Sequence, residues 1–350
     1  MQRFVKLRHL PFALVALVLS ACAAQLVPLP APPNVFPPEP QAELSAATAV
    51  VQSHSVLLNQ MACLSAAAYV GQDQPDATCR QWEQGPGIEM HSFPVTLQNI
   101  WGHTYPGSYT IIVDNNRRQQ AIAIRGTDNF NDWLTDLQFH PVFDDILNVW
   151  VHHGFQIYAR AVLDDLLGPN QHIRLFNPTY DTYITGHSLG GAAAVVLSLY
   201  LYTRYPNALR VDGVYTYGQP KVFDNDGAIS WPKFADGIYH VENCYDPVAL
   251  VPLANDVAHS VFFSPLSVRE ARNQYEHIGH EIVLLDPGMY WVPGQNELVR
   301  NTVGDLDAAI DAIKHNRQTD HAISLYIQRL RMLNSPVNPV NRFASVCHPS

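Results

Sequence analysis

The stretch Gly186-His187-Ser188-Leu189-Gly190-Gly191 decides the fold, because it places a serine between glycines in the spacing G-x-S-x-G. This spacing is typical of a sharp turn from a strand into a helix, where flanking glycines let the backbone close tightly. Both flanks fit, since Tyr183 and Ile184 end a strand-like segment and residues 192–202 form an apolar helical run. The stretch therefore predicts a serine hydroxyl at the head of a helix, with the His187 side chain pointing away from it.

Strands and helices alternate on both sides of this turn. The pattern predicts strands at 109–113, 119–125, 211–217, 239–243 and 281–285, and helices at 45–69, 192–202, 306–313 and 321–333. Such alternation favours an α/β fold with a mostly parallel central sheet and helices on both faces. No second Pro-rich linker, repeat or charge block follows, so residues 44–350 are expected to form one domain.

Composition excludes several classes of protein. With 47% hydrophobic residues in a chain of 350, the protein is too apolar for intrinsic disorder and too long for a small disulfide-stapled scaffold. Its formal net charge of −10 should repel the phosphates of nucleic acids. No apolar run reaches the roughly 18 to 20 residues of a spanning helix, which excludes a multi-span membrane protein. P-loop and dinucleotide fingerprints are absent from the sequence, so no nucleotide cofactor is expected.

The first 43 residues are expected to contain a targeting signal, a membrane anchor and a spacer. A basic start and an apolar stretch at 10–19 predict a signal peptide over residues 1–21. The sequence Leu19-Ser20-Ala21-Cys22 resembles the lipobox of bacterial lipoproteins, which implies an acylated Cys22 anchored in the bacterial cell envelope. Ala23 in place of Asp points to the outer membrane, and a plain secretory signal is the alternative. Prolines at seven of the fifteen positions 27–41 predict an extended spacer within residues 22–43.

Four cysteines remain beyond Cys22, namely Cys63, Cys79, Cys244 and Cys347. An even number in a compartment that permits disulfides predicts two bridges. Three pairings are possible, and the sequence does not choose among them.

Further motifs occur in the order found in the class 3 lipases, the fungal-lipase-like branch of the α/β-hydrolases. The chain resembles that family from about Leu57 to Leu330. The blocks are Ile124-Arg125-Gly126-Thr127, Trp133 with Asp136-Leu137, Val151-His152-His153-Gly154-Phe155, the 186–191 stretch, and Tyr275-Glu276-His277. The resemblance implies an α/β-hydrolase fold and hydrolysis of carboxylic esters, with lipid esters favoured. It does not rank triacylglycerols, phospholipids and short soluble esters.

A serine hydroxyl becomes a good nucleophile when a base takes its proton and a carboxylate orients that base. In α/β-hydrolases the order is Ser, acid, His, so the acid must follow Ser188. Asp246 is preferred, because it comes just after the strand 239–243, and its surroundings are similar to the family's acid block. The rivals lie in a Gly- and Pro-containing connection where Asp usually serves turns: Asp224, Asp226 and Asp236.

Three histidines are candidates for the base: His277, His280 and His321. In the family the base lies just ahead of the last helix or opens it, and Thr319-Asp320-His321 with Tyr326 resembles that block. His277 instead matches a histidine that the family keeps as a non-catalytic residue. Residues 277–281 also lack the H-E-x-x-H spacing of a zinc site, so no metal is expected.

Acyl transfer also needs donors aimed at the tetrahedral oxyanion. The N–H of Leu189 is one expected donor, and Thr127 is the other because it matches the family's Ser or Thr after the strand. Next along the chain, Phe130, Trp133, Leu134 and Leu137 recur at helical spacing. A helix over 129–140 could serve as a lid over the acyl site or simply pack on the core.

Together these features predict an ester hydrolase with Ser188 as nucleophile, His321 as general acid/base and Asp246 as its orienter, acting on lipid or ester substrates. The expected contact with the membrane is through acylated Cys22, and the sequence does not indicate an oligomeric state. A thioesterase or peptidase could use the same triad. The alternative from another class is a catalytically inactive, envelope-tethered binding lipoprotein that keeps the hydrolase fold.

Overall fold

The computed structural model describes residues 41–69, 77–98, 102, 104–127, 141–224, 230–249, 275–285, 288–291, 317–333 and 335–336. The chain divides into the units Met1–Pro38 and Glu39–Ser350, and every described residue lies in the second unit. The predicted signal peptide, Cys22, most of the spacer, the stretch 129–140, the helix at 306–313 and Cys347 lie outside the described residues. No helix in the described ranges is long and apolar enough to cross a membrane.

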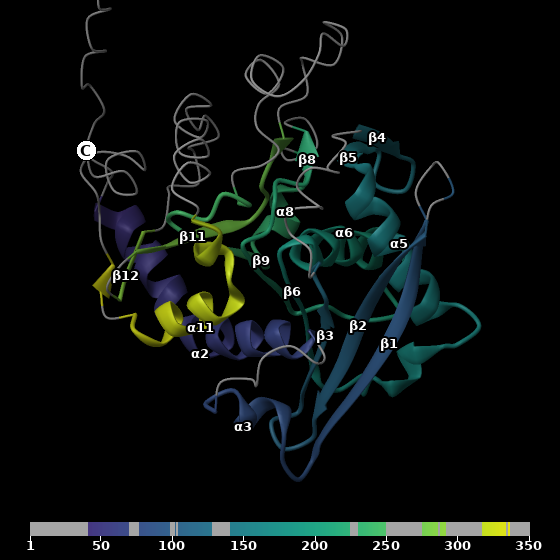
Figure 1. Ribbon diagram of the computed structural model, residues 1–350, viewed down its shortest axis with the longest axis horizontal. Coiled ribbons are helices and arrows are strands. Elements are labelled where there is room, and N and C mark those ends of the chain that lie inside the picture. The colour runs from purple at the N-terminus through teal and green to yellow at the C-terminus, as the bar shows by residue number, and fades with distance from the viewer. Residues whose placement is uncertain are drawn as a thin grey trace, which may run out of the picture. The chain divides into compact units, whose positions relative to one another are not determined.

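The main sheet has the strand order β1-β2-β3-β6-β7-β9-β11-β12-β13 (Figure 1). Its strands are β1 (Ile88–Gln98), β2 (Thr104–Asp114), β3 (Gln119–Ile124), β6 (Asp181–His187), β7 (Gly213–Tyr217), β9 (Ile238–Asn243), β11 (His280–Leu285), β12 (Met289–Trp291) and β13 (Ser335–Pro336). The central run from β3 to β11 is parallel, whereas β1, β2 and β3 pair antiparallel. The predicted mostly parallel sheet is therefore confirmed.

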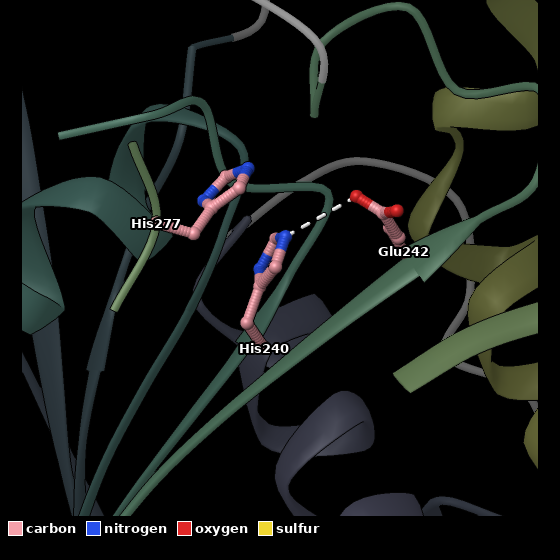
Figure 2. A group of neighbouring side chains, drawn as sticks. All are labelled: His240, Glu242 and His277. Carbon is pink, nitrogen blue, oxygen red and sulfur yellow. Dashed lines mark hydrogen bonds and ion pairs between the residues drawn. The ribbon is translucent and has the colours of Figure 1, made fainter. Parts of the chain in front are cut away.

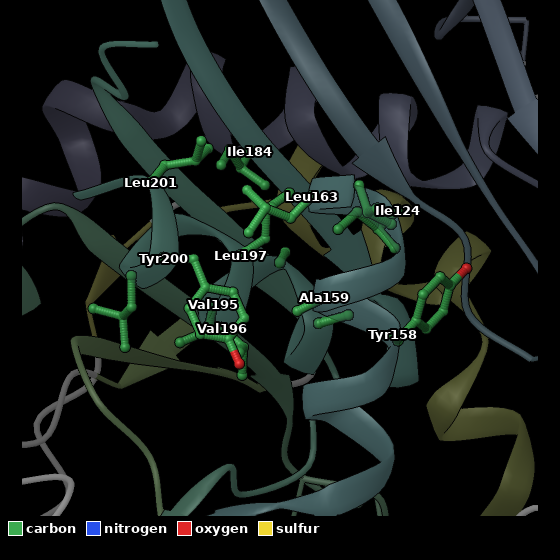
Figure 3. Close-up of a cluster of buried hydrophobic side chains, with 14 of the residues drawn as sticks. Ile124, Tyr158, Ala159, Leu163, Ile184, Val195, Val196, Leu197, Tyr200 and Leu201 are labelled. Carbon is green, nitrogen blue, oxygen red and sulfur yellow. The ribbon is translucent and has the colours of Figure 1, made fainter. Parts of the chain in front are cut away.

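Helices cover both faces of this sheet (Figure 1). The helices are α2 (Gln41–Ala67), α3 (Arg80–Glu83), α5 (His153–Leu167), α6 (Leu189–Arg204), α8 (Pro232–Ala235) and α11 (Ile323–Arg331), with short 3₁₀ turns η1 (His172–Leu175) and η2 (Arg317–His321). Alternation along β3 shows the two cores: Ile122 and Ile124 pack with α5 and α6, whereas Ala121 and Ala123 pack with α2 and α11. Figure 3 shows the first of these clusters, built around α5 and α6.

Helix α6 lies against the sheet so closely that only glycine fits at its start. A Cβ at Gly190 would collide with the backbone of Ile124 and Arg125 in and after β3. Residues 190–201 are all buried, which explains why this segment is apolar on every side. This close contact at Gly190 thus fixes how near the strand-to-helix turn lies to the sheet.

Several features of the fold were not predicted from the sequence. Strand β1 forms a long antiparallel ribbon with β2, and α5 begins at His153, inside the block at 151–155. A second sheet has the order β10-β8-β5-β4, with β4 (Pro141–Asp144), β5 (Val149–His152), β8 (Phe223–Asp224) and β10 (Tyr275–Glu276). Its strands are only two to four residues long, so they give little alternation to detect.

A disulfide joins Cys63 on α2 to Cys79, which precedes α3. Cys244 is disulfide-bonded as well, and its partner lies outside the described residues. Of the three pairings left open by the sequence, the structure thus keeps the one in which Cys63 and Cys79 are partners.

Candidate active site

Ser188 lies in the turn between β6 and α6, as the motif predicts. Its backbone has φ 59° and ψ −133°, a conformation that a residue other than glycine rarely adopts. The turn is held because the Ser188 N–H donates to the carbonyl of Tyr217 (2.9 Å) and its carbonyl accepts from the Gly191 N–H (2.9 Å). The hydroxyl is buried and makes no hydrogen bond to any of the described residues.

The structure brings Asp246 and His321 together, although 75 residues separate them. Asp246 follows β9 in a turn, and His321 ends η2 just before α11. His321 Nδ1 donates to Asp246 Oδ2 over 2.8 Å, and the Val248 N–H donates to Oδ1 over 2.8 Å. Because a carboxylate only accepts, the proton of a neutral His321 sits on Nδ1, which leaves the Nε2 lone pair for a proton from a nucleophile.

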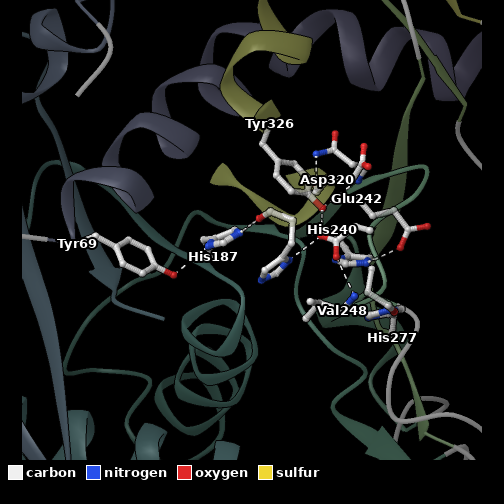
Figure 4. A network of polar contacts seen from close by, with 12 residues as sticks. Tyr69, His187, His240, Glu242, Val248, His277, Asp320 and Tyr326 are labelled. Atoms are coloured by element: carbon white, nitrogen blue, oxygen red, sulfur yellow. Dashed lines mark hydrogen bonds and ion pairs between the residues drawn. The ribbon is translucent and has the colours of Figure 1, made fainter. Parts of the chain in front are cut away.

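Tyr326 provides a further hydrogen bond to the same carboxylate (Figure 4). Its hydroxyl donates to Asp246 Oδ2 over 2.6 Å and accepts from the Asn243 N–H over 2.9 Å. Burial, and then the nearby Asp246 carboxylate, raise the pKa of Tyr326 well above its ordinary value, so it stays a donor. The buried carboxylate of Asp246 therefore accepts three hydrogen bonds, from His321, Val248 and Tyr326.

Because Gly218 has no side chain, it leaves room for the cluster of Asp246, Tyr326 and His321. It follows β7 with φ +54°, and a Cβ there would lie 2.5 Å from Asp246 Oδ2, 2.9 Å from the Tyr326 hydroxyl and 3.0 Å from His321 Nδ1. Gly218 was not among the site residues predicted from the sequence. A glycine directly after the predicted strand 211–217, next to the strand that carries the serine turn, is the signal that could have found it.

The rival acids and bases lie elsewhere. His277 Nε2 donates to the Ala249 carbonyl over 2.8 Å, and the His280 ring stacks on Tyr239 with centroids 5.4 Å apart. Burial lowers the pKa of His280, and the neighbouring Asp236 opposes that effect. The remaining candidate acids are Asp224, which pairs with Tyr275 in the second sheet, and Asp226, which lies outside the described residues. Of the three candidate histidines, only His321 is hydrogen-bonded to Asp246 in the described structure.

The segments that carry the two expected oxyanion donors both come close to the serine. Leu189 is the first residue of α6, a helix of 16 residues whose N-terminal N–H groups carry a partial positive charge. On the other side, Gly126 approaches so closely that a Cβ there would lie 3.2 Å from Ser188 Cβ, and Thr127 follows it. Ser188 thus lies between the N-terminus of α6, which begins with Leu189, and Gly126, the residue before Thr127.

One group of described side chains has the composition of a metal site: His240, Glu242 and His277, whose potential ligand atoms lie within 4.8 Å of one another. This group was not predicted from the sequence, because His277 is distant in the chain from His240 and Glu242. Figure 2 shows the two imidazoles stacked, with centroids 3.9 Å and planes 23° apart, and His240 Nε2 3.3 Å from Glu242 Oε2. Zinc lies in the plane of each bound imidazole at about 2.0–2.1 Å, and nearly parallel rings do not converge on one such point. As arranged, the group does not fit a metal ion.

The strand order of the main sheet, the helices on both of its faces and the turn at Ser188 are those of the α/β-hydrolase fold. Residues 121–256 match the family model described as lipase (class 3). A secreted mono- and diacylglycerol lipase of Fusarium solani is 31% identical over 172 residues, which are 48% of this chain and 49% of that protein. A lipase of Rhizopus niveus is 28% identical over 167 residues, 47% of this chain and 38% of that protein. The chain thus spans about half or less of these relatives.

Solved structures of lipases share the fold. The triacylglyceride lipase of Rhizomucor miehei matches with a TM-score of 0.50 and 24% identity, covering 66% of this chain and 80% of that one. The Lip2 lipase of Yarrowia lipolytica matches with a TM-score of 0.53 and 20% identity, covering 77% of this chain and 92% of that one. These likenesses confirm the α/β-hydrolase fold expected from the sequence.

Proposed function

We propose that this protein is a serine carboxylic-ester hydrolase that cleaves acyl-lipid esters through an acyl-enzyme. The observation that carries the proposal is the buried hydrogen bond from His321 to Asp246, beside a serine held in a strained turn at the head of α6. The family match and the printed activities of the relatives, which act as lipases and phospholipases A1, support the same chemistry.

Each residue has a distinct role in the proposed mechanism. Ser188 Oγ attacks the ester carbonyl while His321 Nε2 takes its proton, and Asp246 stabilises the imidazolium that forms. The Leu189 N–H and Thr127 stabilise the oxyanion of the tetrahedral intermediate. His321 then gives the proton to the leaving alcohol, and the acyl group stays on Ser188. Water, deprotonated by His321, releases the carboxylic acid and regenerates the serine.

The Ser188 hydroxyl makes no hydrogen bond to the described residues of the unliganded chain. Contacts between nucleophile and base are often long or poorly aligned without substrate, and they tighten in the substrate complex. The mechanism therefore places formation of the Ser188–His321 hydrogen bond in the substrate complex.

Hydrolysis of p-nitrophenyl esters of graded chain length by residues 23–350 tests the proposal. Ser188→Ala and His321→Ala should each lower kcat by about 10⁴-fold or more. Ser198→Ala, which removes another buried hydroxyl from α6, and His91→Ala, on the surface of β1, are the matched controls and should keep activity. The same series compared with triacylglycerol and phospholipid emulsions ranks the substrate classes.

Two outcomes would change the assignment. Full activity in His321→Ala together with loss in His277→Ala or His280→Ala would move the base to one of those histidines. No release from any ester by the folded wild-type domain would favour the inactive, envelope-tethered binding lipoprotein.

Location is part of the proposal, and the sequence alone supports it. We propose that residues 1–21 are a signal peptide, that acylated Cys22 and a Pro-rich linker occupy 22–43, and that residues 44–350 are the catalytic domain. In a bacterial host, labelled palmitate should be incorporated into the wild-type protein. The labelled protein should then fractionate with the outer membrane. Cys22→Ser should abolish the label, and labelling that persists in this variant would contradict the proposal.

A further inference from the structure

His187 directly precedes Ser188 in the serine turn, and the proposed triad mechanism gives it no role. Its ring is buried and points toward the phenol of Tyr69 (Figure 4). His187 Nδ1 lies 2.9 Å from the Tyr69 hydroxyl, and Nε2 lies 2.7 Å from the His321 carbonyl oxygen. The expectation that this side chain points away from Ser188 does not explain why it contacts the predicted base.

The direction of each hydrogen bond follows from the groups involved. A carbonyl oxygen only accepts, so His187 Nε2 carries the proton and donates to His321. The neutral ring then has its lone pair on Nδ1, which accepts from the Tyr69 hydroxyl. The Tyr69 hydroxyl also lies close to Gly126, because a Cβ added there would collide with its oxygen. The two hydrogen bonds run in a single direction, from Tyr69 to His187 and from His187 to His321.

Protonation of His187 would reverse this direction, because Nδ1 would become a donor and could no longer accept from the Tyr69 hydroxyl. Burial, and then the neighbouring His321, hold the pKa of His187 well below its ordinary value. Burial also raises the pKa of Tyr69, which keeps its proton available to donate. Both hydrogen bonds are therefore in place at neutral pH.

These contacts join the three segments that the proposed reaction needs. Gly126 belongs to the loop of the oxyanion donor Thr127, His187 precedes the nucleophile, and His321 is the base. The His187 and His321 rings also lie face to face, with centroids 4.5 Å apart and planes tilted by 32°. One tyrosine outside the triad thus contacts the oxyanion loop and, through one histidine, the base.

His321 needs such support because it lies at the end of a five-residue 3₁₀ turn, not in a regular strand or long helix. Its ring is fixed at Nδ1 by Asp246, and the carbonyl of the preceding Asp320 accepts from the Asn243 side chain over 2.7 Å. The bond from His187 fixes the next carbonyl. With ring and backbone both held, the direction of Nε2 is set.

We propose that Tyr69 and His187 are positioning residues that hold the general base and the oxyanion loop in register with Ser188. This inference rests on the proposed ester hydrolysis and adds two residues to it. Neither residue touches the reacting atoms, so their loss should slow the chemical step and leave substrate binding unchanged.

The test is kinetic, with a soluble short-chain p-nitrophenyl ester and purified residues 23–350. Tyr69→Phe removes one hydroxyl and keeps the ring. It should lower kcat by about five- to tenfold while KM stays within about twofold. The matched control is Tyr109→Phe, which removes a buried hydroxyl that bonds another histidine, His172, away from the site. Tyr109→Phe should keep the wild-type kcat even where its thermal midpoint falls as much as that of Tyr69→Phe.

Substitutions of His187 separate the two ends of its ring. His187→Gln can place an amide donor near the His321 carbonyl, whereas His187→Asn can accept from Tyr69 but is too short to reach His321. His187→Gln should therefore keep several-fold more kcat than His187→Asn. Because the bonds act in series, Tyr69→Phe combined with His187→Asn should lose less than the product of the two single losses.

Three results would overturn the inference. These are a kcat for Tyr69→Phe equal to that of Tyr109→Phe, equal activity in the two His187 variants, or losses that multiply in the double variant. A wild-type protein that hydrolyses no ester would refute the proposed function and this inference together. Active wild-type protein with an unaffected Tyr69→Phe would refute the inference alone.

Discussion

Replacing Gly218 with alanine should disable the site while leaving the fold in place. The new Cβ would lie 2.5 Å from Asp246 Oδ2, so the carboxylate or the backbone must move by about 0.9 Å to restore an ordinary contact. A displacement of about 1 Å costs roughly 10²-fold in rate, and loss of the orienting acid costs about 10⁴-fold. We therefore expect kcat to fall by about 10² to 10⁴-fold in Gly218→Ala.

The effect on stability should be much smaller. Alanine at φ +54° costs about 1–2 kcal/mol in the left-handed region. Denaturant unfolding should show a loss of that order, and ester hydrolysis should show the larger loss in kcat. Gly237→Ala is the matched control, since its Cβ would meet nothing nearer than the Phe234 carbonyl oxygen at 3.7 Å. Near wild-type kcat in a folded Gly218→Ala would refute the arrangement of Asp246, Tyr326 and His321 described above.

Three further perturbations test separate parts of the structure. Tyr326→Phe removes a hydrogen bond to the buried Asp246 carboxylate, and such a bond is worth about 1.5–3 kcal/mol. We therefore expect kcat/KM to fall by roughly 10- to 100-fold. An unchanged kcat/KM would contradict the role of that bond. Burial raises the pKa of Glu83 from 4.5 to about 7, and the nearby Arg80 opposes this effect. Between pH 4.5 and 7 the folded state therefore binds a proton that the unfolded state has lost. The free energy of unfolding should fall as pH rises through this range. Glu83→Gln should therefore raise the free energy of unfolding at pH 8 and change it little at pH 4.5, and equal effects at both would refute the assignment. Replacing Cys63 and Cys79 together by serine should lower the free energy of unfolding by about 2–4 kcal/mol, as measured with urea, and no change would show that the bridge does not stabilise the domain.

The sequence predicted the features that local patterns carry. The turn around Ser188 has a backbone conformation that its glycines allow, so five residues were enough to place it between a strand and a helix. The parallel central strands are largely buried on both faces, and their apolar residues form short hydrophobic runs that can be recognised in the sequence. The helix predicted over 45–69 and the strands around the turn at 115–118 are also confirmed, with ends that differ by a few residues.

The tertiary features were harder to predict, because no local pattern carries them. Gly218 matters through a carboxylate 28 positions away, and Tyr69 bonds His187 across 118 positions. The stacked histidines His240 and His277 lie in β9 and just after β10, 37 positions apart in the chain. Their separation matches no metal-binding motif, so the sequence did not indicate that they are neighbours. The choice of His321 over His277 likewise depended on family resemblance, and geometry supplies the hydrogen bond to Asp246 that supports it.

The central claim is that Ser188 is a nucleophile activated by His321, and covalent labelling tests it without reference to a particular substrate. Residues 23–350 would be treated with diethyl p-nitrophenyl phosphate and analysed by intact-mass and peptide mass spectrometry. The account predicts one diethylphosphoryl group per molecule, on the peptide that contains Ser188, with no label in Ser188→Ala and a much slower reaction in His321→Ala. A folded wild-type protein that takes no label, or takes it on another residue, would contradict the account.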